Sequence, residues 1–154
     1  MDQVERACLA ALAAERGDPH SRKTMNLLKI HFNENYRIHY ELMISAENSV
    51  IEIGLHFEDG PEPTTRLLAF FDQYVLEIKH VLGEEFELER WTKSWGHCFE
   101  IWSLEPLTAT FARRLGKRLA EIIDVLQPIL DEAVALGIAA ETPRPSTWRR
   151  RFRR

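Results

Sequence analysis

The stretch YRIHYELMISAENSVIEIGLHFE, residues 36–58, decides the fold. Apolar and polar side chains alternate through residues 36–44 and again through residues 50–58. A period of two residues is typical of a β-strand with one buried face. The SAENS segment between the two runs is short and polar, so the runs are predicted to pair as an antiparallel hairpin.

The same pattern returns later in the chain. FELERWT, residues 86–92, and HCFEIWSLE, residues 97–105, are separated by the turn KSWG and predict a second hairpin. Apolar residues at helical spacing predict the four helices, over residues 3–16, 21–31, 65–82 and 108–136. The predicted order of elements is therefore αα-ββ-α-ββ-α.

This order predicts the fold class. Two antiparallel hairpins can share one sheet, and amphipathic helices can cover one of its faces. The sequence therefore predicts an α+β two-layer sandwich with an antiparallel four-stranded sheet and its helices on one face. Residues 1–137 are expected to form a single domain, with N-terminal helices over 1–35 and the sheet-and-helix core over 36–136. Residues 138–154 are a linker and an arginine-rich tail.

Composition bounds the class of protein. The chain has 154 residues, of which 45% are hydrophobic and 29% charged, and this fits one globular domain with its own core. No apolar run approaches the ~20 residues that cross a membrane. Asp2 and Glu5 stand where a signal peptide would be basic, so a cytoplasmic protein is expected. Cys8 and Cys98 have no CxxC partner and are expected to be small core residues.

The predicted sheet face away from the helices carries charged, histidine and tryptophan side chains. Its expected members are Arg37, His39, Glu41, Glu52, His56, Glu58, Glu87, Glu89, Trp91, Glu100 and Trp102. Tryptophan is enriched at protein interfaces. Trp91, Trp102 and the turn residue Trp95 therefore predict a surface for a homodimer or for another protein. The alternatives are that a loop or the N-terminal helices cover these rings, or that a bulge turns Trp91 or Trp102 to the other face.

Known catalytic and ligand-binding motifs are absent from the sequence. It contains no GxGxxG or GxxxxGK[ST] phosphate loop and no GxSxG nucleophile motif. The E-x-K triplet at residues 77–79 lies in a predicted helix, so a nuclease-type magnesium site is not expected there. His39 and His56 are the best metal-ligand candidates because both belong to the carboxylate-rich face, but nothing specific supports a site. The sequence therefore predicts no catalytic residue, no metal and no cofactor.

The C-terminal tail opposes the rest of the chain in charge. RPSTWRRRFRR, residues 144–154, holds six arginines and no acid, and the rest of the chain keeps 14 of the 20 Lys and Arg against all 24 Asp and Glu. Arginine neutralises phosphate and aromatic rings stack on bases. The residues that predict DNA or RNA binding are Arg144, Trp148, Arg149, Arg150, Arg151, Phe152, Arg153 and Arg154. The alternatives are a tail that docks on the acidic body or stays solvated, and binding to anionic lipid or an acidic protein.

One part of the chain resembles a known group of proteins. The stretch IEIGLHFEDGPEPTTRLLAFFDQYVLEIKHVLGEEFELERW, followed by a hairpin and a helix ending in LQPIL, resembles a family of uncharacterised bacterial and archaeal domains found C-terminal to restriction-endonuclease-like proteins. The resemblance covers residues 36–131 and carries no assigned catalytic residue. It implies an accessory or interaction domain linked to DNA metabolism or phage defence. The helix-strand order also resembles the small acidic dimeric chaperones of type III secretion, from which the basic tail departs.

The sequence thus favours a non-enzymatic domain that acts through protein–protein contact. The alternatives are a nucleic-acid-binding protein that uses its arginine-rich tail and a small acidic dimeric chaperone-like protein.

Overall fold

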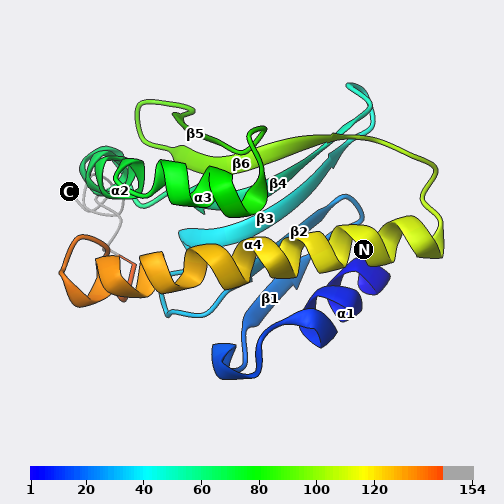
Figure 1. The fold of residues 1–154 in the computed structure, drawn as a ribbon, viewed down its shortest axis with the longest axis horizontal. Helices are drawn as coiled ribbons and strands as arrows, with labels where there is room; N and C mark the ends of the chain where they lie inside the picture. The colour runs from blue at the N-terminus through cyan, green and yellow to red at the C-terminus, as the bar shows by residue number, and fades with distance from the viewer. Residues whose placement is uncertain (144–154) are drawn as a thin grey trace, which may run out of the picture.

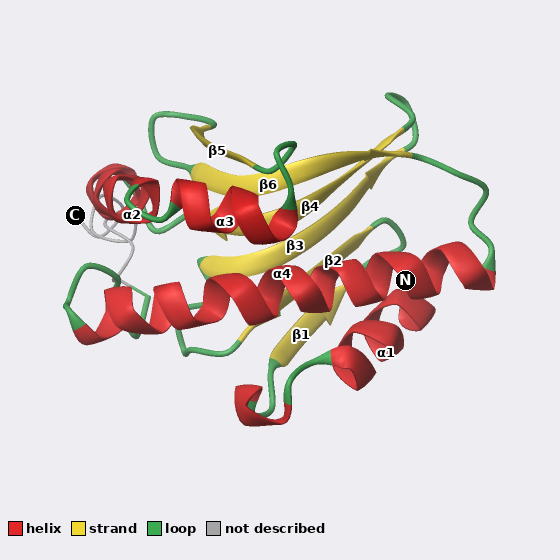
Figure 2. Cartoon of the chain, in the orientation of Figure 1, coloured by secondary structure: helices red, strands yellow, loops and turns green. Residues whose placement is uncertain are grey.

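The computed structural model describes residues 1–143, which form an α+β fold with a six-stranded antiparallel sheet (Figures 1 and 2). The strands lie in the order β1-β2-β3-β4-β6-β5. Their bounds are β1 His20–Lys23, β2 Leu27–His31, β3 Ile38–Ser45, β4 Val50–Phe57, β5 Glu87–Arg90 and β6 Gly96–Ser103. The long strands β3, β4 and β6 stand at the centre of the sheet, where their alternating apolar residues supply most of the buried strand positions.

The helices lie on one face of this sheet, as Figures 1 and 2 show. They are α1 Asp2–Ala11, α2 Pro61–Asp72, α3 Val75–Leu82 and α4 Ala109–Ala135, with a short 3-10 turn over Ala14–Arg16. The long helix α4 crosses the sheet, and α1 packs beside it. The side chain of Thr108 caps α4 by accepting a hydrogen bond from the Phe111 amide at 3.1 Å. Within residues 1–143 no helix covers the other face, which we call the open face.

This architecture confirms the predicted α+β class with helices on one face of the sheet. Both predicted hairpins are also present. The four-stranded sheet and the predicted order of elements are wrong. Residues 20–31 form β1 and β2 instead of a helix, so the N-terminal segment 1–35 extends the sheet by two strands. The segment 65–82 is two helices, α2 and α3, with a break at Gln73 and Tyr74.

The second hairpin differs from prediction in the side to which Glu100 and Trp102 point. His97 pairs with His56 on the open face. Side chains alternate along a strand, so Glu100 and Trp102, three and five residues after His97, face the helices. Glu100 is buried and accepts two hydrogen bonds of 2.7 Å from the Arg118 guanidinium of α4. The indole nitrogen of Trp102 donates to Glu100 at 2.8 Å. The predicted placement of Glu100 and Trp102 on the open face is therefore wrong. The ion pair with Arg118 allows the charged Glu100 side chain to lie on the helix side.

Gly54, in the middle of β4, lies directly against β6. A Cβ atom on Gly54 would be 2.3 Å from the Cys98 carbonyl oxygen and 2.7 Å from the Cα atom of Phe99. Both are backbone atoms of the paired strand, so they cannot yield without disturbing the β4–β6 pairing. The absent side chain also leaves room on the open face, where the Phe99 ring stacks on His97 with 3.8 Å between centroids.

Gly54→Ala is therefore expected to lower the free energy of unfolding by about 3 kcal/mol, the upper part of the usual range for an overpacked position. Chemical denaturation followed by circular dichroism measures the difference. Ser103→Ala changes an exposed residue of β6 on the same face and is the matched control. Wild-type stability in the Gly54→Ala protein would contradict the close pairing of β4 with β6.

Candidate metal centre on the open face

A row of histidines crosses the open face from strand to strand. Its members are His20 of β1, His31 of β2, His39 of β3, His56 of β4 and His97 of β6. Three of the four neighbouring pairs in this row have ring centroids 5.1–5.7 Å apart. Five of the six histidines of the chain therefore share one line perpendicular to the strands, although they are far apart in sequence.

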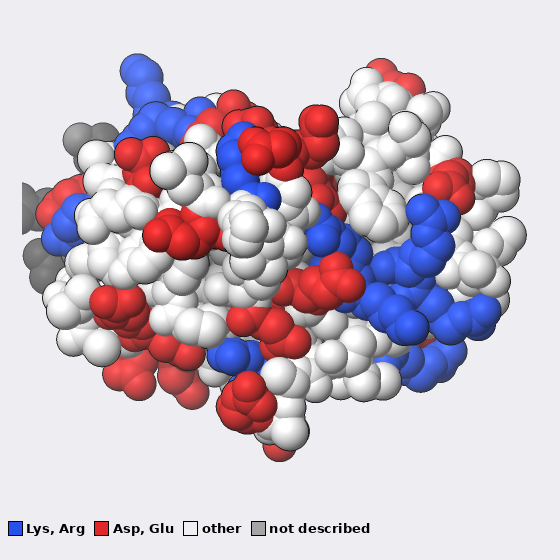
Figure 3. Space-filling model, in the orientation of Figure 1, with Lys and Arg blue, Asp and Glu red and all other residues white. Residues whose placement is uncertain are grey.

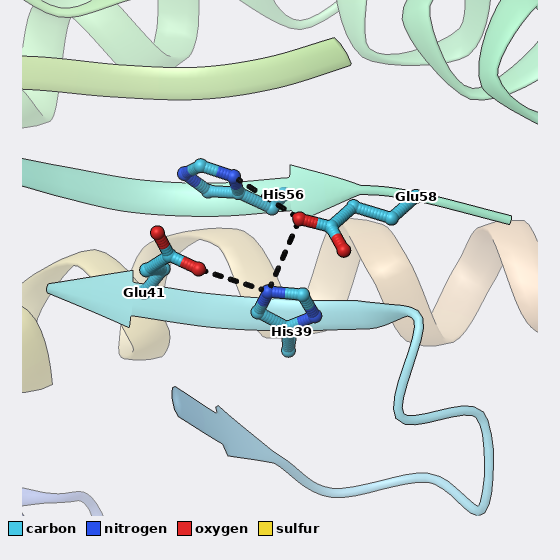
Figure 4. A group of neighbouring side chains, drawn as sticks. All are labelled: His39, Glu41, His56 and Glu58. Atoms are coloured by element: carbon cyan, nitrogen blue, oxygen red, sulfur yellow. Dashed lines mark hydrogen bonds and ion pairs between the residues drawn. The ribbon is translucent and has the colours of Figure 1, made fainter. Parts of the chain in front are cut away.

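At the centre of this row, four side chains of β3 and the end of β4 point toward one another (Figure 4). His39 Nε2 lies 3.3 Å from Glu41 Oε2 and 3.8 Å from Glu58 Oε1, and His56 Nδ1 lies 3.9 Å from the same Glu58 oxygen. We call His39, Glu41, His56 and Glu58 the β3–β4 cluster. Its four donor atoms all lie within 4.8 Å of one another, as the ligands of a single metal ion do.

His39 is held in one orientation by the backbone. Its Nδ1 lies 2.9 Å from the Tyr36 carbonyl oxygen. Because a carbonyl oxygen only accepts, Nδ1 donates this hydrogen bond, and Nε2 is the ring nitrogen that faces Glu41 and Glu58. Metal-ligating histidines are commonly oriented in this way, with the second ring nitrogen bonded to a backbone carbonyl.

His56 is buried without hydrogen bonds. It is only 1% exposed, and neither of its ring nitrogens has a hydrogen-bond partner in residues 1–143. Glu52 Oε1 lies 3.0 Å from Nε2, but this ion-pair contact does not have the direction of a hydrogen bond. Burying an unpaired polar group costs free energy. His56 is therefore the one described side chain whose buried nitrogens are left to be satisfied by something else.

A second group of donors shares His56. Glu52 Oε1 lies 3.0 Å from His56 Nε2 and 3.2 Å from His97 Nδ1, and these three residues also meet the spacing of a metal site. The other nitrogen of His97, Nε2, lies 3.1 Å from Glu89 Oε1 of the edge strand β5. His56 thus stands between two sets of donors, one facing each of its ring nitrogens.

One carboxylate of each group, Glu41 and Glu52, is held in the ionised form. Burial on its own raises the pKa of Glu41, but contacts with His39, His56 and the Lys29 ammonium outweigh it and hold the pKa at about 2. Burial also raises the pKa of Glu52, but contacts with His56 and His97 outweigh it and hold the pKa at about 2. Ionised carboxylates are the form that a metal ion binds.

Aromatic rings close one side of the row. The Trp91 ring stacks on His97 with 5.6 Å between centroids and meets the edge of His56 at 6.1 Å. Trp91 and Trp95 are 49% and 39% exposed and lie 5.7 Å apart. Trp102 is half-buried on the helix side beneath the Arg114 guanidinium. The predicted protein-contact surface therefore keeps Trp91 and Trp95 together, and Trp102 does not belong to it.

The other predicted residues fall in three places. His39 and His56 share the carboxylate-rich face, as the alternation predicts, but His97 was missed as their neighbour. Cys8 and Cys98 are buried core residues, which confirms the prediction for both, and burial raises the pKa of Cys8 to about 12. The tail residues Arg144, Trp148, Arg149, Arg150, Arg151, Phe152, Arg153 and Arg154 lie outside the described residues.

No protein-family model matches the chain, and a search of curated proteins finds no match either. The resemblance to domains that accompany restriction-endonuclease-like proteins therefore stays a prediction from the sequence pattern. In residues 1–143 none of the helices combines the length and the hydropathy needed to span a bilayer.

Proposed function

We propose that the protein binds a divalent transition-metal ion, of which Zn²⁺ is the type, in the β3–β4 cluster. The observation that carries the proposal is His56, whose two buried ring nitrogens lack hydrogen bonds although carboxylates lie on both sides of the ring. A metal ion at Nδ1 would satisfy one of these nitrogens and join it to His39, Glu41 and Glu58.

The donor set and its spacing support a metal of this class. Zinc takes histidine nitrogen and carboxylate oxygen in tetrahedral sites with bonds of about 2.0–2.2 Å, which places neighbouring donors about 3.3 Å apart. The contacts within the β3–β4 cluster measure 3.3, 3.8 and 3.9 Å. The 3.8 and 3.9 Å separations are longer than hydrogen bonds. The 3.3 Å separation, which is also a hydrogen-bond contact, equals the edge of such a tetrahedron.

The charge of the cluster also favours a cation. Glu41 and Glu58 face one resident cation, the Lys29 ammonium, which lies 2.9 Å from Glu41 Oε2 and 3.6 Å from Glu58 Oε1. Lys29 balances one of the two negative charges and leaves the other beside the rings of His39 and His56. A divalent ion would compensate this remaining charge among side chains that are 1–21% exposed.

Titration with Co²⁺ tests the proposal directly. Tetrahedral Co²⁺ absorbs visible light much more strongly than hexa-aquo Co²⁺, so the spectrum reports the coordination geometry of the bound ion. We expect one equivalent of Co²⁺ to produce intense visible bands that Zn²⁺ abolishes by displacement. A spectrum that stays that of aquated Co²⁺ at millimolar protein and metal would contradict the proposal.

A second candidate function is contact with another protein or with a second copy of this chain. The exposed rings of Trp91 and Trp95 favour it, because large aromatic side chains are enriched at interfaces. Changing both residues to alanine is then expected to shift the mass measured by light scattering toward the monomer. An unchanged mass and unchanged partner binding would argue against this surface.

Nucleic-acid binding remains the alternative for the arginine-rich tail. On the helix side, Lys and Arg gather over α1 and the first half of α4 (Figure 3), where α4 carries Arg113, Arg114, Lys117 and Arg118. The second half of α4 is acidic instead. Deleting residues 144–154 is expected to weaken DNA or RNA binding, and binding should fall steeply as salt rises. Salt-independent binding would count against this alternative.

A further inference from the structure

A cavity of about 470 Å³ opens beside the β3–β4 cluster, toward the β1–β2 edge of the open face. It falls within the range of small-molecule sites. His39 and Glu58 line it and also belong to the cluster. A molecule in this cavity would therefore lie next to the proposed metal.

Positive charge dominates the cavity. Arg22, Lys23, Lys29 and Arg37 line it, and Glu58 is the only carboxylate among its lining residues in the described part of the chain. Lys23 is paired with Asp2 and Glu5. Lys29 is paired with Glu41 and Glu58, and the Arg37 guanidinium lies 3.4 Å from Asp59. Arg22 makes no ion pair within residues 1–143 and lies beside Lys29 across the β1–β2 pairing. A ligand could therefore engage the Arg22 guanidinium together with the neighbouring Lys29 ammonium.

The remaining lining residues add an apolar wall. Leu27 and Tyr36 contribute to it, and the Tyr36 ring is 56% exposed with the Arg37 guanidinium 5.9 Å from its centroid. An exposed ring at the mouth of a cationic cavity can stack on a planar group. The cavity therefore combines a place for an anion with a place for an apolar or aromatic group.

We propose that this cavity binds a phosphate monoester whose phosphate contacts Arg22 and Lys29 and whose organic group packs on Tyr36. Arginine and lysine are the side chains that recognise phosphate. A phosphate monoester carries a charge of about −1.5 to −2 at neutral pH, which suits more than one cation. The inference rests on the proposed function in one respect: the shared residues His39 and Glu58 place the phosphate beside the metal.

Phenyl phosphate is the probe, with benzenesulfonate as a comparison monoanion of similar size. Binding is measured by calorimetry on metal-free and Co²⁺-loaded full-length protein, and the visible Co²⁺ spectrum is recorded on the same samples. We expect phenyl phosphate to bind more tightly than benzenesulfonate and to change the Co²⁺ spectrum. Arg22→Ala should weaken the binding of phenyl phosphate by about tenfold, because one charge-assisted contact is lost. It should leave the affinity for Co²⁺ unchanged. Arg113→Ala, an exposed change on α4, should leave both unchanged.

The outcomes separate this inference from the proposed function. Co²⁺ binding without phenyl phosphate binding, or with binding that Arg22→Ala does not weaken, would overturn the cavity assignment and keep the metal site. Phenyl phosphate binding that depends on Arg22 in a protein that takes up no Co²⁺ would support the cavity assignment and overturn the proposed metal. Binding that Arg113→Ala weakens as much as Arg22→Ala would also overturn the assignment, because it would show attraction to the surface in general.

Discussion

His56→Ala is expected to raise the dissociation constant for Zn²⁺ by more than about 100-fold. His56 is the donor shared by both groups on the open face, so the change removes a ligand from each. Loss of an outer-sphere partner alone costs 10–100-fold in metal affinity, and loss of a ligand should exceed this. The wild-type protein should gain about 2.7 kcal/mol of stability at a Zn²⁺ concentration of 100 times its Kd, and the variant should gain less than about 0.4 kcal/mol at the same concentration.

Two further variants make this result specific. His80→Ala removes the one histidine outside the row, an exposed residue of α3, and should leave Zn²⁺ stabilisation unchanged. Glu58→Gln keeps the shape of a partly exposed side chain while removing its charge, so it should weaken Zn²⁺ binding without unfolding the protein. Equal Zn²⁺ stabilisation of wild type, His56→Ala and Glu58→Gln would place metal binding elsewhere.

Glu100→Ala is expected to lower the free energy of unfolding by about 3–5 kcal/mol, the usual cost of removing one partner from a buried ion pair. The Arg118 guanidinium would lose both of its 2.7 Å bonds to Glu100. Arg118 also donates to the Leu82 carbonyl oxygen at the end of α3, so it joins α4 to both β6 and α3. Urea denaturation of wild type and variant measures the loss.

A double variant separates the ion pair from general packing. Replacing a buried ion pair by apolar residues of similar size is often neutral or stabilising. Glu100→Met combined with Arg118→Met should therefore be more stable than Glu100→Ala alone. Arg113→Ala, on the exposed side of α4, is the control and should be close to neutral. Strictly additive effects at Glu100 and Arg118 would contradict the coupling of the two side chains.

The central strands could be predicted from sequence because their alternation is long. Residues 36–44 and 50–58 alternate over nine positions each, and β3 and β4 occupy most of them. β1 and β2 could not be predicted, because each is no more than five residues long. Over so short a run, Met25, Leu28 and Phe32 fit a helix as well as Leu28, Ile30 and Phe32 fit a strand. Pairing with β3 decides between them.

The candidate site could be predicted only in part, because it depends on the register between strands. Alternation placed His39 and His56 on one face, and β3–β4 pairing sets them directly opposite each other. In HCFEIWSLE both alternating sets contain apolar and polar residues, so neither identifies the buried face. Only the position of Arg118 on α4 shows why Glu100 turns inward and His97 joins the row.

Anomalous diffraction at the zinc absorption edge, from crystals grown with Zn²⁺, tests the central claim most directly. We predict one strong peak between β3 and β4, about 2.0–2.2 Å from His39 Nε2, His56 Nδ1 and a carboxylate oxygen of both Glu41 and Glu58. The peak should be absent from crystals of the His56→Ala protein. Zinc peaks found only at other residues, with the β3–β4 cluster unchanged, would contradict the assignment of this open face as a metal site.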